Sequence, residues 1–231
     1  MAKNEILNVP RHVGLIMDGN RRWAKKRLLP PSSGHSAGLN RMVSLAERAK
    51  EVGVKYLTVY ALSTENLSRP QDELDKMFAL IRKQFNSCVE KLLKVGAAVR
   101  VIGDLSLLPE DVQKLIADGV KKSPDNASFT FVMALGYGAR NEIVRAANLA
   151  LKEGGEVTEE RLSSLMYTGG IPDPDLIIRT GGELRLSNFL LWQSAYAELY
   201  FSDVLFPDFT DEEFDRAIAD YSSRDRRFGK V

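Results

Sequence analysis

The segment His12–Trp23 reads HVGLIMDGNRRW and joins an apolar run to a polar turn that contains glycine. The apolar part, His12–Met17, has the length and composition of a buried strand. The turn leads into a helical segment, so backbone N–H groups and the positive end of a helix dipole can face an anion there. Arginine binds phosphate in a bidentate manner, and Asp18 can hold a divalent cation on phosphate oxygens. The segment fits either a diphosphate site with a metal ion or an ordinary β–α turn, with Asp18 and Asn20 as turn and cap residues.

Outward from this segment, apolar runs suited to strands alternate with helical patterns. Strands are predicted at residues 12–17, 55–62, 97–102, 129–135, 175–178 and 198–201. Helices are predicted at residues 37–52, 71–92, 141–152 and 210–221, with short helices after Pro109 and Thr158. The prolines and serines of residues 27–35 indicate a loop. The alternation predicts an α/β fold: a single domain with a mostly parallel central sheet of about six strands, flanked by helices. This domain is expected to span residues 1–231, with an N-terminal extension at 1–11 and a basic tail at 222–231.

The composition limits the classes of function that the chain can have. Hydrophobic residues make up 44% and charged residues 27% of the 231 residues, which is ordinary for a soluble globular protein. The net charge of +1 gives no general attraction to nucleic acid or anionic membrane, so any anion site must be local. Cys88 is the single cysteine and the chain has two histidines, which argues against a disulfide and a zinc site. Without a signal-peptide pattern or an apolar run of about 20 residues, a cytoplasmic location is expected.

Three polar clusters come directly after predicted strands. They are Asp18–Trp23 together with His35, then Ser63, Glu65, Asn66 and Arg69, and finally residues 179–188 with the sequence RTGGELRLSN. Because the carboxyl ends of parallel strands meet at one edge of a sheet, the clusters are expected to form one site. Taken singly, the third cluster also fits a polar loop with surface arginines, and His35 fits a capping or surface histidine. Glu198, at the start of the last strand, fits a second metal ligand or an ordinary surface charge.

A long apolar stripe lies on the helix that follows Pro70. Its members are Leu74, Met77, Phe78, Ile81, Phe85, Val89 and Leu92. Core packing explains such a stripe position by position, but an apolar wall beside several arginines also suits a substrate with a phosphate head and a hydrocarbon tail. A nucleotide is disfavoured because neither G-x-x-x-x-G-K-[ST] nor a G-x-G-x-x-G after a strand occurs.

Together these segments resemble the cis-prenyltransferases, the family of undecaprenyl diphosphate synthase. The matching motifs, within residues 12–229, are MDGN at 17–20 with Arg22-Trp23, GH at 34–35 with Gly38, YA at 60–61 with Ser63, Glu65-Asn66 and Arg69-Pro70, IRTGGE at 178–183, SNFLLWQ at 187–193, and RRFG at 226–229. The combination in this order is specific, although no single motif is. The aspartate-rich D-D-x-x-D boxes of the unrelated trans-prenyltransferases are absent.

The resemblance implies an enzyme that condenses isopentenyl diphosphate head-to-tail onto an allylic diphosphate (farnesyl, geranyl or dimethylallyl) and forms cis double bonds. The undecaprenyl carrier for cell-wall synthesis is the expected product. Mg²⁺ on Asp18 is implied, with Glu198 as a further ligand, and Ser63 and Asn66 are placed beside the reacting carbons. Asn66 is the position usually assigned to proton removal, but an amide is a poor base, so diphosphate itself is an alternative proton acceptor.

The resemblance also implies a set of substrate-binding residues. Those implied for the allylic diphosphate are Gly19, Asn20, Arg22, His35 and Arg69. Those implied for isopentenyl diphosphate are Arg179, Arg185 and Ser187. Further substrate-binding positions are Arg21, Trp23, Thr64, Glu65, Leu67 and Leu186. The growing chain is expected to lie in a hydrophobic tunnel beside the sheet, along the helix from Leu74 to Leu92. A homodimer is expected, with the C-terminal Arg-Phe-Gly reaching toward the partner's site, and a transient membrane-surface contact for product release.

The chain departs from the family pattern at several positions. Arg21 stands where most members have glycine, and Pro31 where many place a diphosphate-binding arginine, so Arg21 or Arg27 is hypothesised to replace that charge. Further departures are Leu67 for tryptophan, Leu184 for histidine, and Gly136 and Ala139 within an Asn-Tyr-Gly-Gly pattern. These changes leave product length and substrate preference open, including a short-chain or irregular (head-to-middle) synthase. A non-catalytic partner subunit is disfavoured, because such subunits lose the metal aspartate and the diphosphate arginines.

Overall fold

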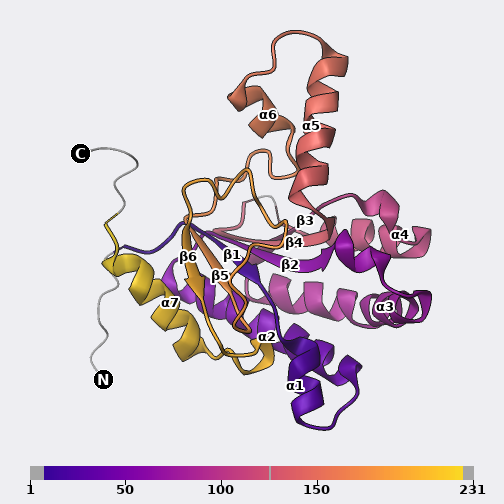
Figure 1. The fold of residues 1–231 in the computed structure, drawn as a ribbon, viewed down its shortest axis with the longest axis vertical. Coiled ribbons are helices and arrows are strands. Elements are labelled where there is room, and N and C mark those ends of the chain that lie inside the picture. Colours follow the sequence, from indigo (N-terminus) through magenta and orange to yellow (C-terminus); the bar gives the residue numbers. More distant parts are fainter. Residues whose placement is uncertain (1–7, 125, 226–231) are drawn as a thin grey trace.

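A parallel sheet forms the centre of the molecule (Figure 1). The computed structural model describes residues 8–124 and 126–225, and within this part of the chain six strands form one sheet. The strands are β1 His12–Ile16, β2 Tyr56–Ser63, β3 Ala97–Ile102, β4 Phe129–Tyr137, β5 Leu176–Arg179 and β6 Glu198–Phe201. Their order is β3-β4-β2-β1-β5-β6, and every neighbouring pair is parallel. The predicted α/β fold with a parallel six-stranded sheet is confirmed.

Helices connect the strands as the sequence predicts, except between β5 and β6, where residues 180–197 contain no α-helix. They are α1 Asn20–Lys26, α2 Pro31–Val52, α3 Gln71–Lys94, α4 Glu110–Val120, α5 Ala139–Glu153, α6 Glu159–Leu165 and α7 Asp211–Ser223, with short 3₁₀ helices η1 Glu65–Ser68, η2 Leu105–Leu107 and η3 Phe206–Asp208. No helix in residues 8–124 and 126–225 has the length and hydrophobicity that a bilayer span requires. The predicted extension at 1–11 falls partly, and the RRFG motif at 226–229 wholly, outside the described residues.

Helix α2 begins earlier than predicted. Residues 27–35 carry loop signals, yet only residues 27–30 lie outside a helix. Pro31 occupies the first helical turn, where its fixed φ suits the helix and its missing N–H leaves nothing unpaired. Gly34 lies against α1, and a Cβ there would come within 2.0 Å of the backbone oxygen of Asn20. The loop prediction was wrong because glycine marks a close contact between two helices here, rather than a break in the chain.

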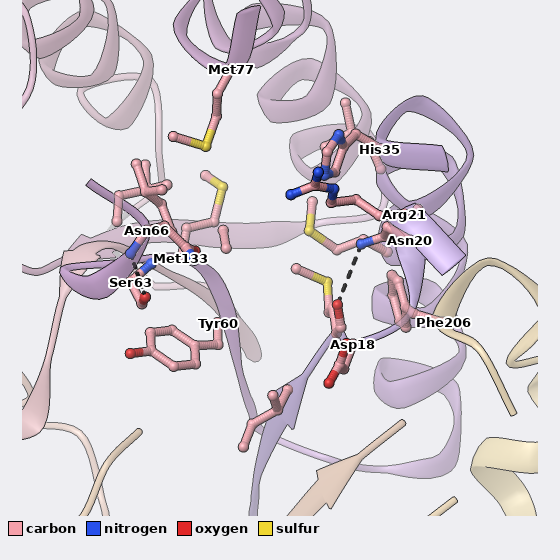
Figure 2. Close-up of a pocket in the computed structure, with 18 of the residues that line it drawn as sticks. Asp18, Asn20, Arg21, His35, Tyr60, Ser63, Asn66, Met77, Met133 and Phe206 are labelled. Carbon is pink, nitrogen blue, oxygen red and sulfur yellow. Dashed lines mark hydrogen bonds between the residues drawn. The ribbon is translucent and has the colours of Figure 1, made fainter. Parts of the chain in front are cut away.

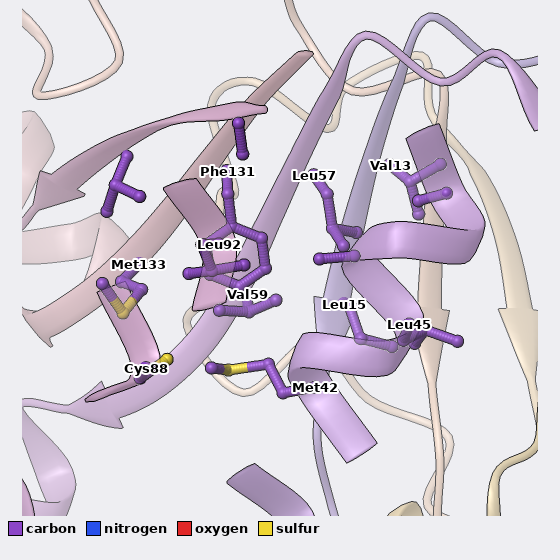
Figure 3. Packing of buried hydrophobic residues seen from close by; sticks show 14 of the residues in the cluster. Val13, Leu15, Met42, Leu45, Leu57, Val59, Cys88, Leu92, Phe131 and Met133 are labelled. Carbon is purple, nitrogen blue, oxygen red and sulfur yellow. The ribbon is translucent and has the colours of Figure 1, made fainter. Parts of the chain in front are cut away.

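Two apolar clusters cover opposite faces of the sheet. Side chains alternate along a strand, so Leu15 of β1 faces one side while its neighbour Ile16 faces the other. On the first side the strands pack against α2, α3 and α7, for example against Leu45 and Leu92 (Figure 3). On the second side the covering segment includes Phe189, in the loop between β5 and β6. Helices α5 and α6 project from this body, away from α2 and α3 (Figure 1).

Candidate active site

A cavity of about 780 Å³ opens where β1, β2 and β5 end (Figure 2). Its polar lining is Asp18, Gly19, Asn20, Arg21, Arg22, His35, Ser63, Glu65, Asn66, Arg69, Arg179, Arg185, Ser187 and Asn188. These residues come from all three polar clusters that the sequence singles out, so the clusters do meet at one edge of the sheet. The volume lies within the range of small-molecule and cofactor sites.

Asp18 lies at the centre of the polar lining, directly after β1. Its carboxylate accepts hydrogen bonds from Arg179, with Nη2 and Oδ2 2.9 Å apart, and pairs with Arg22, with Nη2 and Oδ1 3.1 Å apart. Partial burial alone would raise the pKa of Asp18, but the two guanidinium groups outweigh this effect and lower it. Asp18 is therefore an ionised carboxylate that already has two cations beside it.

Arg179 ties the end of β1 to the third cluster. It is buried at the end of β5, and its Nη1 donates to Ser187 Oγ at 2.7 Å and to the backbone oxygen of Arg185 at 2.5 Å. The Nε atom of Arg179 is buried with no hydrogen-bond partner among the described residues. Arg185 donates to Glu183 at 2.6 Å, so its charge is partly balanced by a neighbouring carboxylate. One side of the cavity thus has the fixed, buried guanidinium of Arg179 next to the more exposed guanidinium of Arg185.

A second part of the polar lining comes from α1, α2 and the segment before α3. Arg21 pairs with Glu73 at 3.2 Å, and Figure 2 shows its guanidinium beside His35. Burial, together with the nearby charges of Arg69 and Arg21, lowers the pKa of His35, so its imidazole is neutral at pH 7. Of the two arginines hypothesised to replace the missing family arginine, Arg21 lines the cavity, whereas Arg27 does not.

Asn66 and Ser63 hold each other in place at the end of β2 (Figure 2). The backbone N–H of Ser63 donates to Asn66 Oδ1 at 3.2 Å, and the backbone N–H of Asn66 donates to Ser63 Oγ at 3.1 Å. Both side chains line the cavity with their orientation fixed by the backbone. Because Asn66 Oδ1 accepts this backbone N–H, the orientation of its amide group is fixed.

The apolar stripe on α3 divides between cavity and core. The α3 residues that line the cavity are Met77, Leu80, Ile81, Gln84, Phe85 and Cys88. The wall from residue 77 to residue 88 is about 17 Å long at the rise of an α-helix. Burial raises the pKa of Cys88 to about 12, so its thiol is neutral and forms part of an inert wall. Val89 and Leu92 do not line the cavity and belong to the apolar core cluster. Figure 3 shows Leu92 within this cluster. The predicted hydrophobic tunnel beside the sheet is confirmed as an apolar cavity.

Four predicted substrate-binding residues do not line the cavity: Trp23, Thr64, Leu67 and Leu186. Trp23 donates its indole N–H to Asp208 at 2.7 Å and stacks under Arg27, whose guanidinium lies 4.2 Å from the ring centroid. Leu67 and Leu186 each pack against an apolar cluster. In this structure the side chains of these four residues do not contact the interior of the cavity.

Glu198 does not reach Asp18 within the chain. It begins β6 opposite Leu176, the first residue of β5, whereas Arg179, which binds Asp18, is the last. Three residues along a strand correspond to about 10 Å, and β6 is also separated from β1 by β5. Glu198 pairs with Arg224 at 2.7 Å instead. Asp18 and Glu198 of one chain therefore lie apart, and no group of three or more metal-binding side chains occurs in residues 8–124 and 126–225.

Asn188 lines the cavity, although no role was predicted for it. It lies in a loop in which Ser187, Asn188 and Leu190 have positive φ angles of 49°, 64° and 45°. Asparagine tolerates this left-handed conformation better than most residues. The sequence places Asn188 in the third polar cluster and in the SNFLLWQ motif, but this signal is weak because loops contain asparagine for many reasons.

The comparisons with known proteins agree with this geometry. A family model described as "Putative undecaprenyl diphosphate synthase" matches residues 16–229. An isoprenyl transferase of Fusobacterium nucleatum is 48% identical over 225 residues, which cover 97% of each chain. A crystal structure of a probable undecaprenyl diphosphate synthase from Campylobacter jejuni is 38% identical with a TM-score of 0.83, and the match covers 96% of this chain and 100% of the other. Lavandulyl diphosphate synthase from Lavandula x intermedia, solved with dimethylallyl diphosphate, is 36% identical with a TM-score of 0.91, covering 98% and 100% of the two chains.

A cationic sheet edge that opens into an apolar cavity, together with these matches, defines a cis-prenyltransferase. The chain belongs to the undecaprenyl diphosphate synthase family. It is a transferase, and its family implies isoprenoid diphosphate substrates.

Proposed function

We propose that the chain is a Mg²⁺-dependent enzyme that condenses isopentenyl diphosphate head-to-tail onto an allylic diphosphate, with undecaprenyl diphosphate as its product. The observation that carries this proposal is the single cavity that combines cations from two sides with an apolar wall on α3. Two diphosphate heads require two sets of cations, and a growing hydrocarbon requires a wall without charge.

The two sets of cations suggest which substrate each binds. Arg179, Arg185 and Ser187 bind the diphosphate of isopentenyl diphosphate, because Arg179 and Ser187 form one fixed unit. The allylic diphosphate lies beside Gly19, Asn20, Arg21, Arg22, His35 and Arg69, and Asp18 connects the two sets through its bonds to Arg22 and Arg179. In this proposal the reacting carbons lie between the two diphosphate groups, next to Asn66 and Ser63. A diphosphate oxygen takes the proton, since Asn66 Oδ1 accepts a backbone N–H.

A magnesium ion fits the residues present. Mg²⁺ favours oxygen ligands and is often held by one carboxylate together with substrate phosphates and water. Asp18 supplies one ionised carboxylate at the cavity, which matches this pattern. The ion, when bound, neutralises charge on the departing diphosphate. Asp18 positions it, and the guanidinium groups of Arg22 and Arg179 hold the carboxylate in place.

A homodimer also belongs to the proposal. Strand β6 lies at one edge of the sheet, and Leu199 on it is 37% exposed while the nearby Tyr196 is 71% exposed. Apolar side chains beside an edge strand favour contact with another protein surface. A second copy of the chain is the partner we propose for this edge.

A second candidate is a short-chain or irregular synthase. It is favoured by the TM-score of 0.91 to lavandulyl diphosphate synthase and by Arg21, which makes the allylic side more positive than in most members. The two candidates differ in product length and in the connection between units, not in the residues that bind diphosphate.

Incubation with Mg²⁺, radiolabelled isopentenyl diphosphate and farnesyl, geranyl or dimethylallyl diphosphate separates the candidates. A ladder that ends at C55 supports the undecaprenyl product, and a product of one condensation supports the short-chain candidate. No incorporation with any primer would contradict both.

Asp18→Ala tests the metal position. We expect turnover to fall about a thousandfold, because the ion contributes several kcal/mol of charge stabilisation. Asp111→Ala removes a carboxylate outside the cavity, paired with Arg82, and serves as the matched control. Circular dichroism should show an unchanged fold in both variants. Full activity in Asp18→Ala would disprove the assignment.

A further inference from the structure

The loop at residues 187–190 is held in a conformation that its residues do not favour. Three of its four residues are non-glycine residues with positive φ, and Leu28 is the only other such residue in the described part of the chain. Backbone of this kind costs about 1–3 kcal/mol per residue and persists only where surrounding contacts enforce it. The contacts that enforce this loop therefore matter for the position of Ser187.

Asn188 supplies contacts on one side of the loop. Its backbone oxygen accepts the N–H of Ala139 at 2.9 Å, and its side-chain Oδ1 accepts the N–H of Arg140 at 2.9 Å. Both N–H groups belong to the first turn of α5, where they have no partner inside the helix. Asn188 thus caps α5 from a distant part of the sequence and fixes the loop to the end of β4.

The other side of Asn188 reaches the second polar cluster. Its Nδ2 donates to Glu65 Oε1 at 2.8 Å. Burial alone would raise the pKa of Glu65, but the bond from Asn188 helps to lower it, so the acceptor is ionised and the bond is charge-assisted. Glu65 precedes Asn66, whose side chain is fixed to Ser63. One amide therefore connects the loop of Ser187 to the segment of Asn66.

These contacts form one continuous path across the cavity. It runs from Asp18 to Arg179 at 2.9 Å, from Arg179 to Ser187 at 2.7 Å, along the backbone to Asn188, and from there to Glu65 at 2.8 Å. Every residue on this path lines the cavity. The path joins the side proposed for isopentenyl diphosphate to the segment beside the reacting carbons.

We propose that Asn188 is a positioning residue whose hydrogen bond to Glu65 sets the spacing between the isopentenyl diphosphate side of the cavity and Asn66. This inference rests on the proposed function. The bond acts through the loop rather than on either substrate, so its loss misaligns two bound substrates without removing a diphosphate contact. The expected signature is a fall in kcat with little change in either KM.

Three variants distinguish the effect of losing the hydrogen bond between Asn188 and Glu65 from the effect of changing the backbone strain at Asn188. Asn188→Asp keeps an acceptor for Arg140 N–H and tolerates the left-handed φ, but places two carboxylates against each other. Asn188→Gly relieves the strain and removes both side-chain bonds. Asn188→Asp combined with Glu65→Gln restores the bond with donor and acceptor exchanged. Asn148→Asp, at an exposed position on α5, is the matched control.

We expect Asn188→Asp and Asn188→Gly to lower kcat about tenfold or more, as loss of a charge-assisted hydrogen bond predicts, with each KM changed less than about threefold. The double variant should return kcat to within about threefold of Glu65→Gln alone. If the wild type is active, an unchanged kcat in Asn188→Asp would overturn the inference. A folded double variant whose kcat does not recover would overturn it as well. An inactive wild type would instead contradict the proposed function, and the inference with it.

Discussion

At the scale of single residues, the sequence predicts that Arg21 is unusual but does not predict its contact partner. The sequence identifies it as a departure from glycine, but its partner Glu73 lies far along the chain on α3, and no local pattern predicts that pair. Both side chains are partly exposed, at 52% and 35%. Such pairs contribute about 0–1 kcal/mol, so Arg21 can leave Glu73 for a diphosphate at little cost.

Glu73→Gln should therefore lower the KM for the allylic diphosphate about threefold, because Arg21 no longer has a competing carboxylate. Arg21→Gly should raise that KM about tenfold and leave the KM for isopentenyl diphosphate unchanged. Steady-state kinetics with each substrate varied in turn makes the measurement. Asp72→Asn, which removes a charge from the same helical turn, is the control. If Asp72→Asn lowers the KM for the allylic diphosphate equally, the loss of a negative charge near the site, and not the release of Arg21, is responsible.

At the scale of elements, the contact between α1 and α2 fixes the position of the two helices that carry residues proposed to bind the allylic diphosphate. Gly38 lies one turn after Gly34, and a Cβ there would come within 2.3 Å of Asn20 Oδ1. Periodicity predicts the strands and helices well because each buries one face, but it cannot show where two helices touch. The loop prediction at residues 27–35 was wrong for this reason. Local composition shows that a glycine is present, but only the contact between α1 and α2 explains why a glycine is needed there.

Gly34→Ala should lower the free energy of unfolding by about 1–3 kcal/mol, because the added methyl meets the rigid backbone of Asn20. It should also raise the KM for the allylic diphosphate, since α1 must shift. Urea unfolding followed by circular dichroism measures the first effect. Ser32→Ala, on the exposed side of the same helix, should change neither quantity by a comparable amount. An unchanged unfolding curve for Gly34→Ala would contradict the close packing.

At the scale of the whole molecule, the parallel sheet brings the three clusters together. That convergence was predictable, because strand ends that follow alternating helices share one edge. The separation of Glu198 from Asp18 was not, because it depends on the register of β6 against β5 rather than on residue type. The role of Asn188 was not predictable either, since its partners on α5 and η1 are distant in sequence.

The buried His12 makes the stability of this sheet depend on pH. Its Nδ1 lies 2.6 Å from the oxygen of Pro172, which can only accept, so Nδ1 carries the proton and Nε2 accepts from Thr58 at 2.7 Å. Burial lowers the pKa of His12 from 6.5 to about 4. Between these values the unfolded chain binds more protons, so stability is complete above pH 6.5 and falls as the pH drops toward 4.

At pH 5 this histidine should lower the free energy of unfolding by about 2 kcal/mol relative to pH 7. Urea unfolding at both pH values measures the difference. In His12→Gln, which does not titrate, the difference between the two pH values should shrink by that amount. The same pH dependence in wild type and variant would show that other groups are responsible.

The position of β1 also affects how the protein forms during synthesis. Translation delivers β1 first, yet this strand lies between β2 and β5 in the finished sheet. A nascent chain that has emerged through Tyr137 can form the part of the sheet made of β3, β4, β2 and β1, but the side of β1 that pairs with β5 stays uncovered until β5 follows. Arg179, Arg185 and Ser187 arrive with or after β5. The cavity therefore gains its second set of cations only once β5 and the loop after it have been made, and a chain cut short before β5 has an apolar wall without the cations proposed to hold isopentenyl diphosphate.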